Sequence, residues 1–237
     1  MSGSFLPERA SGRRSWTPGE RLTGRLPDPA PDPSAPTIGV LALQGDVIEH
    51  VRTLHRCGAN VVQVRSAGDI AAVDGLVVPG GESTTIGKLL ERFGLLHPLQ
   101  ERIAGGLPVF GTCAGMILLS DELDQDRPQP LLGGLHVRTR RNAFGGQRDS
   151  FDTRIEVDGI DGGPIDVAFI RAPRVEAVLA DDVEVLAEVR GFPVVVRQGP
   201  LLAAAFHPEV TGDDRLHAAF VATVRGAAGF APSGTAT

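Results

Sequence analysis

LPVFGTCAGMILL, residues 107–119, is the most informative segment of this 237-residue chain. Its first four residues predict a buried strand, and residues 116–119 can begin a helix. The pattern Gly111-x-Cys113-x-Gly115 between them has the form of a nucleophile elbow with cysteine as its central residue. A cysteine at a helix N-terminus favours the reactive thiolate form. The alternative is a buried structural cysteine, which is the commoner role of this residue.

Strand and helix patterns alternate along the chain. Apolar runs predict strands at 38–43, 61–64, 75–78 and 107–110. Helical spacing predicts helices after Asp46, which can cap the first of them, and at 83–93, 96–104 and 213–225. The candidate strands of the second half are 135–140, 151–157, 167–170, 183–189, 193–197 and 201–206. The alternation predicts a doubly wound, mainly parallel sheet, and the later run of short strands predicts an antiparallel part.

Residues 1–36 differ in composition from the rest of the chain. They are rich in proline and arginine and poor in aliphatic side chains. Such a segment cannot bury enough apolar surface to offset the entropy lost on ordering it. We therefore expect a disordered leader over 1–36, one α/β domain over 37–227 and a flexible tail over 228–237.

The overall composition excludes several classes of protein. A hydrophobic content of 42% and a charged content of 22% are typical of a soluble globular protein. No apolar run approaches the roughly 18 residues that a membrane span needs. The net charge of −6 argues against nucleic-acid binding through general electrostatics. Two cysteines cannot form a disulfide framework, which suits a cytoplasmic protein.

His207-Pro208-Glu209 follows the last predicted strand. Proline favours an extended conformation for the residue before it, and residues two apart in an extended segment project to the same side. We therefore expect the Glu209 carboxylate to lie beside the His207 imidazole, as the orienting acid and the base of a Cys-His-Glu triad. A surface turn with an acid that caps a helix is the alternative.

A glycine-rich loop, Pro79-Gly80-Gly81-Glu82-Ser83-Thr84-Thr85, leaves the third predicted strand and enters a helix. Consecutive glycines let backbone N–H groups point into a site. The spacing matches neither nucleotide-binding fingerprint, so an oxyanion hole for the cysteine chemistry is the better interpretation. A helix cap with Ser83 at the N-cap position is compatible with it. The remaining histidines lack metal-ligand spacing, so no metal site is predicted, and Cys57 is interpreted as a packed small residue.

The cysteine elbow, the His-Pro-Glu segment and the glycine-rich loop together resemble the class I glutamine amidotransferases. Within that class, the resemblance is to the branch that supplies the glutaminase subunit of two-component pyridoxal 5′-phosphate synthases. The resemblance runs from about Ile38 to Gly226 and implies a single-domain, flavodoxin-like three-layer fold with a mixed, mainly parallel central sheet. Besides the elbow and the glycine-rich loop, the segments that carry it are Ala42-Leu43-Gln44-Gly45, Glu49-His50, Arg141-Asn142-Ala143-Phe144-Gly145, Ser150-Phe151, Phe169-Ile170-Arg171-Ala172-Pro173 and Phe206-His207-Pro208-Glu209. The chain departs from the family at Gly146, where arginine is usual, which affects a contact near that loop but none of the triad.

The resemblance also implies roles for individual residues. Cys113 would be the nucleophile, His207 the acid and base, and Glu209 its partner. The residues implied in binding L-glutamine are Gly81, Glu82, Ser83, Arg141, Ile170 and Arg171. The oxyanion hole would use the N–H groups of Gly81 and Ala114, and this step needs no cofactor and no metal.

The activity that the resemblance implies is hydrolysis of L-glutamine to L-glutamate and ammonia, with the ammonia passed to a barrel-shaped synthase subunit that makes pyridoxal 5′-phosphate. Residues around Gln44-Gly45 are candidates to contact that partner. Two other enzymes stay open as alternatives: a glutaminase of another synthase, such as that of histidine biosynthesis, and a stand-alone cysteine hydrolase. A degenerate fold kept as a binding module is the non-enzymatic alternative, and the presence of Cys113, His207 and Glu209 argues against it.

Overall fold

The computed structural model describes residues 31–125, 127–141 and 150–230. The first 30 residues of the predicted leader, the residues from 231 in the predicted tail, and the departure at Gly146 lie outside these ranges. The chain divides into two units, Met1–Pro31 and Asp32–Thr237. The elements described here all belong to the second unit.

The elements of this unit alternate between strand and helix in its first half and are mostly strands in its second. In chain order they are β1 (Thr37–Leu41), α1 (Val47–Arg56), β2 (Asn60–Val64), α2 (Ala67–Ala71), β3 (Gly75–Val78), α3 (Ser83–Arg92), α4 (Leu96–Ala104), β4 (Val109–Thr112), α5 (Ala114–Leu119), β5 (Ser120–Asp124), β6 (Leu135–Arg140), β7 (Phe151–Ile155), β8 (Ile165–Phe169), β9 (Arg174–Val178), β10 (Glu184–Val189), β11 (Phe192–Gln198), β12 (Leu201–Ala204), α6 (Pro208–Thr211) and α7 (Arg215–Ala228).

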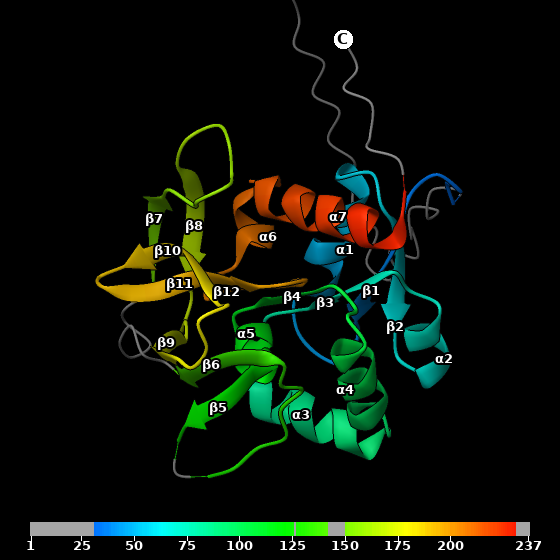
Figure 1. Ribbon diagram of the computed structural model, residues 1–237, viewed down its shortest axis with the longest axis horizontal. Helices are drawn as coiled ribbons and strands as arrows, with labels where there is room; N and C mark the ends of the chain where they lie inside the picture. Colours follow the sequence, from blue (N-terminus) through cyan, green and yellow to red (C-terminus); the bar gives the residue numbers. More distant parts are fainter. Residues whose placement is uncertain (1–30, 126, 142–149, 231–237) are drawn as a thin grey trace, which may run out of the picture. The chain divides into compact units, whose positions relative to one another are not determined.

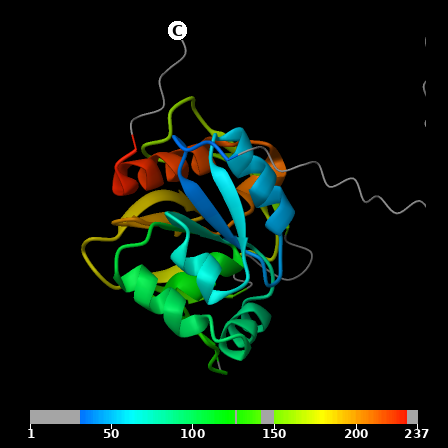
Figure 2. The same ribbon diagram turned by 90° about the vertical axis from the view of Figure 1, so that its right-hand side faces the viewer.

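A seven-stranded sheet forms the centre, in the order β10-β11-β12-β4-β3-β1-β2. The strands from β12 to β2 pair in parallel, whereas β11 runs antiparallel to both of its neighbours. Helices α1, α6 and α7 cover one face, and α3, α4 and α5 cover the other (Figures 1 and 2). The predicted mixed, mainly parallel α/β sheet is therefore confirmed. Its inner strands are buried and almost entirely apolar, as expected where both faces of a sheet are covered.

Some element boundaries differ from the prediction. The first strand ends at Leu41 rather than at residue 43, because residues 42–46 turn out of the sheet toward α1. The elements α2, β5, β9 and α6 were not predicted. Helix α2 has only five residues and depends on a local capping box between Ser66 and Asp69. Strand β5 carries three acids and a single partly buried Leu123, so its composition does not suggest a strand.

Residues 32–36, which the prediction assigned to the leader, contact the rest of this unit. The backbone N–H of Asp32 donates to Asn60 Oδ1 over 2.8 Å, and Asn60 Nδ2 donates to the carbonyl of Ala35 over 3.0 Å. At the other end of the unit, α7 continues to Ala228.

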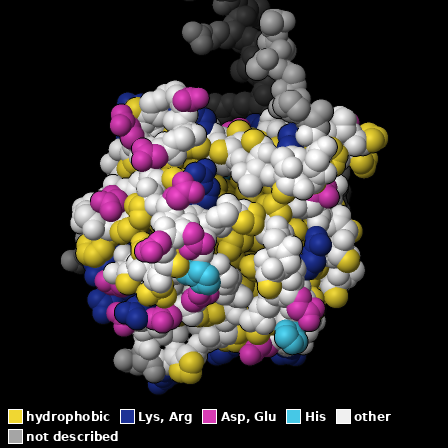
Figure 3. All heavy atoms as spheres, viewed as in Figure 1, with side chains coloured by type: hydrophobic (Ala, Val, Ile, Leu, Met, Phe, Trp, Pro, Cys, Tyr) yellow, Lys and Arg dark blue, Asp and Glu magenta, His cyan; other side chains and the backbone are white. Residues whose placement is uncertain are grey.

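The surface of this unit mixes charges of both signs. On the face shown in Figure 3, Lys and Arg side chains are dispersed among Asp and Glu side chains. In the part of the chain that the structure describes, no helix is both long enough and apolar enough to cross a membrane.

Candidate active site

Four adjacent strands end at the same edge of the sheet, and the loop after each of them contributes to one site. Strands β12, β4, β3 and β1 are neighbours and run parallel, so their carboxyl ends lie together. The loops that follow them carry His207, Cys113, Gly81 and Asp46, in that order. Parallel pairing therefore gathers four segments that are far apart in the sequence.

Cys113 lies on a strained turn between β4 and α5, as the elbow pattern predicts. Its φ of 47° and ψ of −102° fall in a region that residues with a Cβ rarely occupy. Its backbone N–H donates to the carbonyl of Ala204 in β12 over 2.8 Å. The side chain is 7% exposed. Because the helix begins at the next residue, the thiol lies at a helix N-terminus.

The glycines on either side of the elbow are required by close packing. A Cβ on Gly115 would lie 2.0 Å from the carbonyl oxygen of Val78 in β3, and a Cβ on Gly111 would lie 2.6 Å from the backbone of Gly115. Real Cβ atoms do not approach other atoms this closely. The start of α5 can therefore lie against β3 only because these positions lack a side chain.

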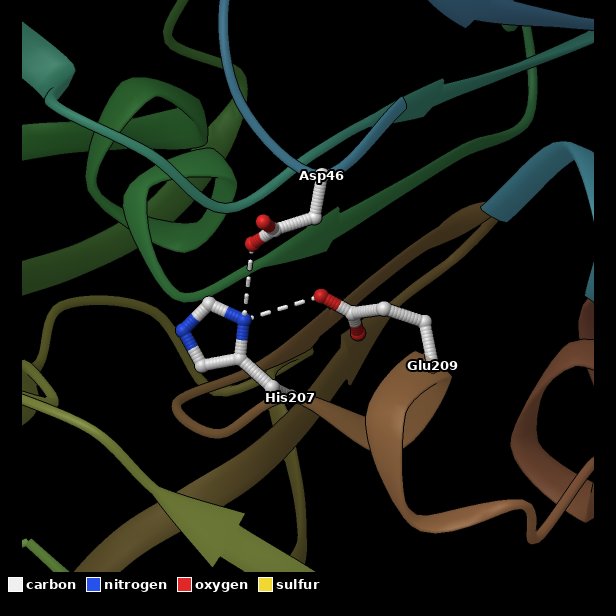
Figure 4. A group of neighbouring side chains, drawn as sticks. All are labelled: Asp46, His207 and Glu209. Atoms are coloured by element: carbon white, nitrogen blue, oxygen red, sulfur yellow. Dashed lines mark hydrogen bonds and ion pairs between the residues drawn. The ribbon is translucent and has the colours of Figure 1, made fainter. Parts of the chain in front are cut away.

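His207 and Glu209 lie together, but not for the reason that the sequence suggested. His207 is the N-cap residue of α6, with Pro208 in the first turn, so Glu209 belongs to a helix and not to an extended segment. Proline is favoured in the first turn of a helix, where its missing N–H costs nothing. From there the Glu209 carboxylate folds back, and its Oε1 lies 2.8 Å from His207 Nδ1 (Figure 4).

A second carboxylate, that of Asp46, lies on the same imidazole nitrogen. Its Oδ2 is 3.2 Å from His207 Nδ1 (Figure 4). The sequence predicted Asp46 as a helix cap; it does hold the N-cap position of α1, but its carboxylate is directed at His207. Its role at the site was missed. The available signal was its place in the loop that follows the carboxyl end of a parallel strand, where ligand sites form in such sheets.

The surroundings of His207 favour its protonated form. Burial lowers the pKa of His207, but its contacts with Asp46, Cys113 and Glu209 outweigh burial and raise it to about 12. The hydrogen bond with His207 lowers the pKa of Asp46, whereas burial raises the pKa of Glu209. These contacts favour the imidazolium form of His207, which lies between two carboxylates and the Cys113 sulfur and can exchange a proton with a group bound next to that sulfur.

A cavity of about 320 Å³ opens beside Cys113. It is lined by Gln44, Asp46, Gly81, Glu82, Ser83, Cys113, Ala114, Ile117, Arg141, Ile170, Arg171 and His207. All the predicted site residues except Glu209 line it, and Glu209 lies behind His207. Gln44 was predicted to contact the partner subunit, and Ile117 was not predicted as a site residue.

Glu82 and Arg141 form an ion pair at this cavity. Arg141 Nη2 lies 2.5 Å from Glu82 Oε1, and Arg141 Nη1 donates to Thr84 Oγ1 over 2.7 Å. Glu82, and not Ser83, is the N-cap of α3, because its carboxylate accepts the N–H groups of Thr84 and Thr85. Burial raises the pKa of Glu82, but the hydrogen bonds from Thr85, Arg141 and Thr84 outweigh it and lower the pKa to about 2.

The glycine-rich loop packs tightly against the loop after β1. Gly80 accepts a 3.3 Å hydrogen bond from the N–H of Asp46, and the N–H of Glu82 donates to Gln44 Oε1 over 2.8 Å. Gly81 has a φ of 148°. A Cβ on Gly45 would lie 1.8 Å from the Gly80 carbonyl oxygen. The orientation of the Gly80–Gly81 peptide is therefore coupled to residues 44–46.

Neither a metal site nor a second nucleophile is assigned among the described residues. Among the described residues, Asp46, His207 and Glu209 are the one group with metal-like spacing; we assign no metal there, because His207 Nδ1 already serves as a donor to both carboxylates. Cys57 is half-buried, and burial raises its pKa to about 11. It therefore behaves as a packed side chain and not as a second nucleophile.

The fold and the site define a class of protein: an α/β protein with a cysteine elbow backed by a histidine and a glutamate. Residues 40–226 match the model of the SNO glutamine amidotransferase family. The chain is 63% identical to the pyridoxal 5′-phosphate synthase subunit PdxT of Parafrankia sp. (strain EAN1pec), over 81% of this chain and 95% of that protein. It is 56% identical to the PdxT of Nocardia farcinica (strain IFM 10152), over 84% of this chain and 91% of the relative.

A solved structure supports the same assignment. A crystal structure described as a glutamine amidotransferase matches with a TM-score of 0.74 and 46% identity, over 79% of this chain and 98% of the other. The chain belongs to the SNO glutamine amidotransferase family.

Proposed function

We propose that this chain is the glutaminase subunit of a pyridoxal 5′-phosphate synthase, which hydrolyses L-glutamine to L-glutamate and ammonia and passes the ammonia to a synthase subunit. The observation that carries the proposal is the cavity beside Cys113, with His207 in contact with the thiol and Glu209 behind the imidazole. The names of the relatives support the identity of the partner. Both cysteines carry free thiols, which suits a cytoplasmic enzyme.

The chemistry follows from the arrangement of the three side chains. The Cys113 thiolate attacks the side-chain amide carbon of glutamine, and the N–H groups of Ala114 and Gly81 stabilise the negative charge on the amide oxygen. His207 gives its proton to the nitrogen as the C–N bond breaks, so ammonia leaves and a glutamyl thioester remains. His207 then takes a proton from a water molecule, which attacks the thioester and releases glutamate and the thiol. The step uses no cofactor.

The charged pair at the cavity fits the free amino-acid end of glutamine. Arg141 offers a planar fork to the α-carboxylate, and Glu82 offers an acceptor to the α-ammonium group. The two side chains also form an ion pair with each other. Gly81, Ser83, Ile170 and Arg171 complete the lining of the proposed glutamine site.

We expect Arg141→Ala to raise the KM for glutamine about 10- to 100-fold, the range for loss of a charged hydrogen bond, and to change kcat much less. Steady-state titration of glutamine with the assembled enzyme measures both constants. Arg140→Ala is the matched control, because Arg140 is the preceding residue and pairs with Asp124 on the surface. An unchanged KM in the Arg141 variant would remove this residue from the glutamine site.

The isolated chain should hydrolyse glutamine slowly until its partner binds. The Gly80–Gly81 peptide can direct either its carbonyl or its N–H toward the oxyanion, and the contact with Asp46 couples it to residues 44–46, where we propose that the synthase subunit docks. An oxyanion donor contributes about 10²- to 10³-fold in rate, so activation of that order is expected.

The test is ammonia release from glutamine across a titration with purified synthase subunit. Full activity without partner would contradict the coupling while leaving the glutaminase proposal intact. Activation by the synthase of histidine biosynthesis, but not by a pyridoxal-phosphate synthase barrel, would favour the alternative glutaminase. Absence of glutamine hydrolysis with every partner would favour the binding-module alternative.

A further inference from the structure

Two buried histidines lie behind the triad and have no part in the proposed chemistry. His50 of α1 and His217 of α7 are both 0% exposed. Nδ1 of His50 lies 2.9 Å from Nε2 of His217. Nε2 of His50 faces two groups, Thr112 Oγ1 at 3.1 Å and Glu209 Oε1 at 3.5 Å. One imidazole nitrogen thus contacts both the residue before the nucleophile and the carboxylate of the triad.

Both histidines are neutral in the fold. Burial, with repulsion from His217 and His207, holds the pKa of His50 well below its usual value. Burial lowers the pKa of His217 to about 4, although the nearby Asp214 opposes the shift. The other charged group that faces His217 is Arg56, which lowers its pKa further. Each ring therefore carries a single N–H.

The neighbours of His50 favour one position for its N–H. A carboxylate oxygen such as Glu209 Oε1 can only accept from His50, and the Thr112 hydroxyl can accept as well, so we assign the N–H of His50 to Nε2. With its N–H on Nε2, His50 presents a lone pair at Nδ1, and His217 Nε2–H donates to it. The remaining nitrogen, His217 Nδ1, is then an acceptor, and it has no hydrogen-bond partner among the described residues. The opposite assignment would set a lone pair against the carboxylate.

We propose that His50 is a positioning residue for the glutaminase reaction: its Nε2–H holds the Glu209 carboxylate ionised and aimed at His207, and His217 keeps His50 in the required tautomer. Oε2 of Glu209 has no partner in the described part of the chain. His50 is therefore the one described side chain, besides His207, that offers Glu209 a donor. The inference rests on the proposed function, because Glu209 matters only if His207 carries the reaction.

The first test compares three variants in the assembled enzyme. We expect His50→Leu to lower kcat for glutamine about 10- to 100-fold, with little change in KM. This is the range found when a hydrogen-bonding group that orients a metal-binding side chain is removed. Loss of the donor raises the pKa of Glu209, so the acid limb of the kcat profile should move to higher pH. His50→Gln, which retains an N–H near the Nε2 position, should recover most of the activity. Leu54→Met is the packing control, because Leu54 is equally buried on the same helix and the exchange keeps the side-chain volume nearly constant.

The second test does not depend on activity. Two-bond ¹H–¹⁵N correlations of the imidazole rings in the isolated chain should show His50 and His217 both protonated at Nε2. Protonation of His50 at Nδ1 would overturn the inference, as would a His50→Leu enzyme with wild-type kcat and pH profile. If His50→Leu does not fold, His217→Leu should give a smaller loss of kcat with the same shift of the acid limb. A wild-type complex that releases no ammonia would refute the proposed function instead, and the tautomer measurement would then test only the hydrogen bond from His50 to Glu209.

Discussion

Replacing Cys113 by alanine should lower glutamine-dependent ammonia release about 10⁴-fold or more, the scale found when a catalytic nucleophile is removed. The fold should persist. Alanine keeps the Cβ, so the backbone strain at a φ of 47° is the same in both proteins. Only a sulfur atom at the cavity is removed. Ammonia release by the variant in complex with its synthase, together with its thermal unfolding, measures both expectations.

The second cysteine provides the control for this variant. Cys57→Ala removes a thiol that is half-buried and far in sequence from the elbow, and we expect its glutaminase activity to match that of the wild type. The Cys113→Ala complex should still make product from added ammonium, because the synthase subunit is intact. Substantial use of glutamine by this variant would refute the assignment of Cys113 as the nucleophile.

The second large effect is expected from Gly80→Ala. A Cβ at this position would lie 2.3 Å from His207 Cε1, 2.9 Å from His207 Nδ1 and 3.1 Å from Asp46 Oδ2. The imidazole must therefore shift, and misplacing a reacting group by about 1 Å costs roughly 10²-fold in rate. We expect kcat for glutamine to fall by at least about that factor.

The matched control is Gly226→Ala in α7, where an added Cβ has nothing within 4 Å. Alanine is a better helix former than glycine, so this variant should be fully active and slightly more stable. Steady-state kinetics and thermal unfolding of both variants give the comparison. A Gly80→Ala enzyme with wild-type kcat would mean that His207 can work from another position and that the contact with Gly80 is not needed.

Much of the fold could be predicted because its signals are local. The apolar runs of β1, β3 and β4 are strands buried on both faces, and the boundaries of α4 and β6 follow from their own periodicity. Because neighbouring parallel strands end at the same edge of a sheet, the loops that follow four strands of the central sheet lie together. The elbow at Cys113 could be predicted for the same reason, since a strand, a sharp turn and a helix are encoded within a few consecutive residues.

The partners of the site residues could not be predicted in this way. Glu209 was correctly expected beside His207, although a helix turn and not an extended segment brings it there. Asp46 was expected to cap its own helix, and its carboxylate is instead used by an imidazole on another loop. Glu82 and Arg141 were both assigned to glutamine binding, and the structure shows that they also form an ion pair with each other.

The difference lies in the distance along the chain over which each feature is specified. Secondary structure and the elbow depend on residues a few positions apart, whose spacing the sequence displays directly. His50 and His217 are separated by 167 positions, and they meet only because α1 and α7 pack on the same face of the sheet (Figure 2). No local pattern encodes which buried polar groups such packing will bring together. Burial then requires those groups to find hydrogen-bond partners among the neighbours that the packed helices provide.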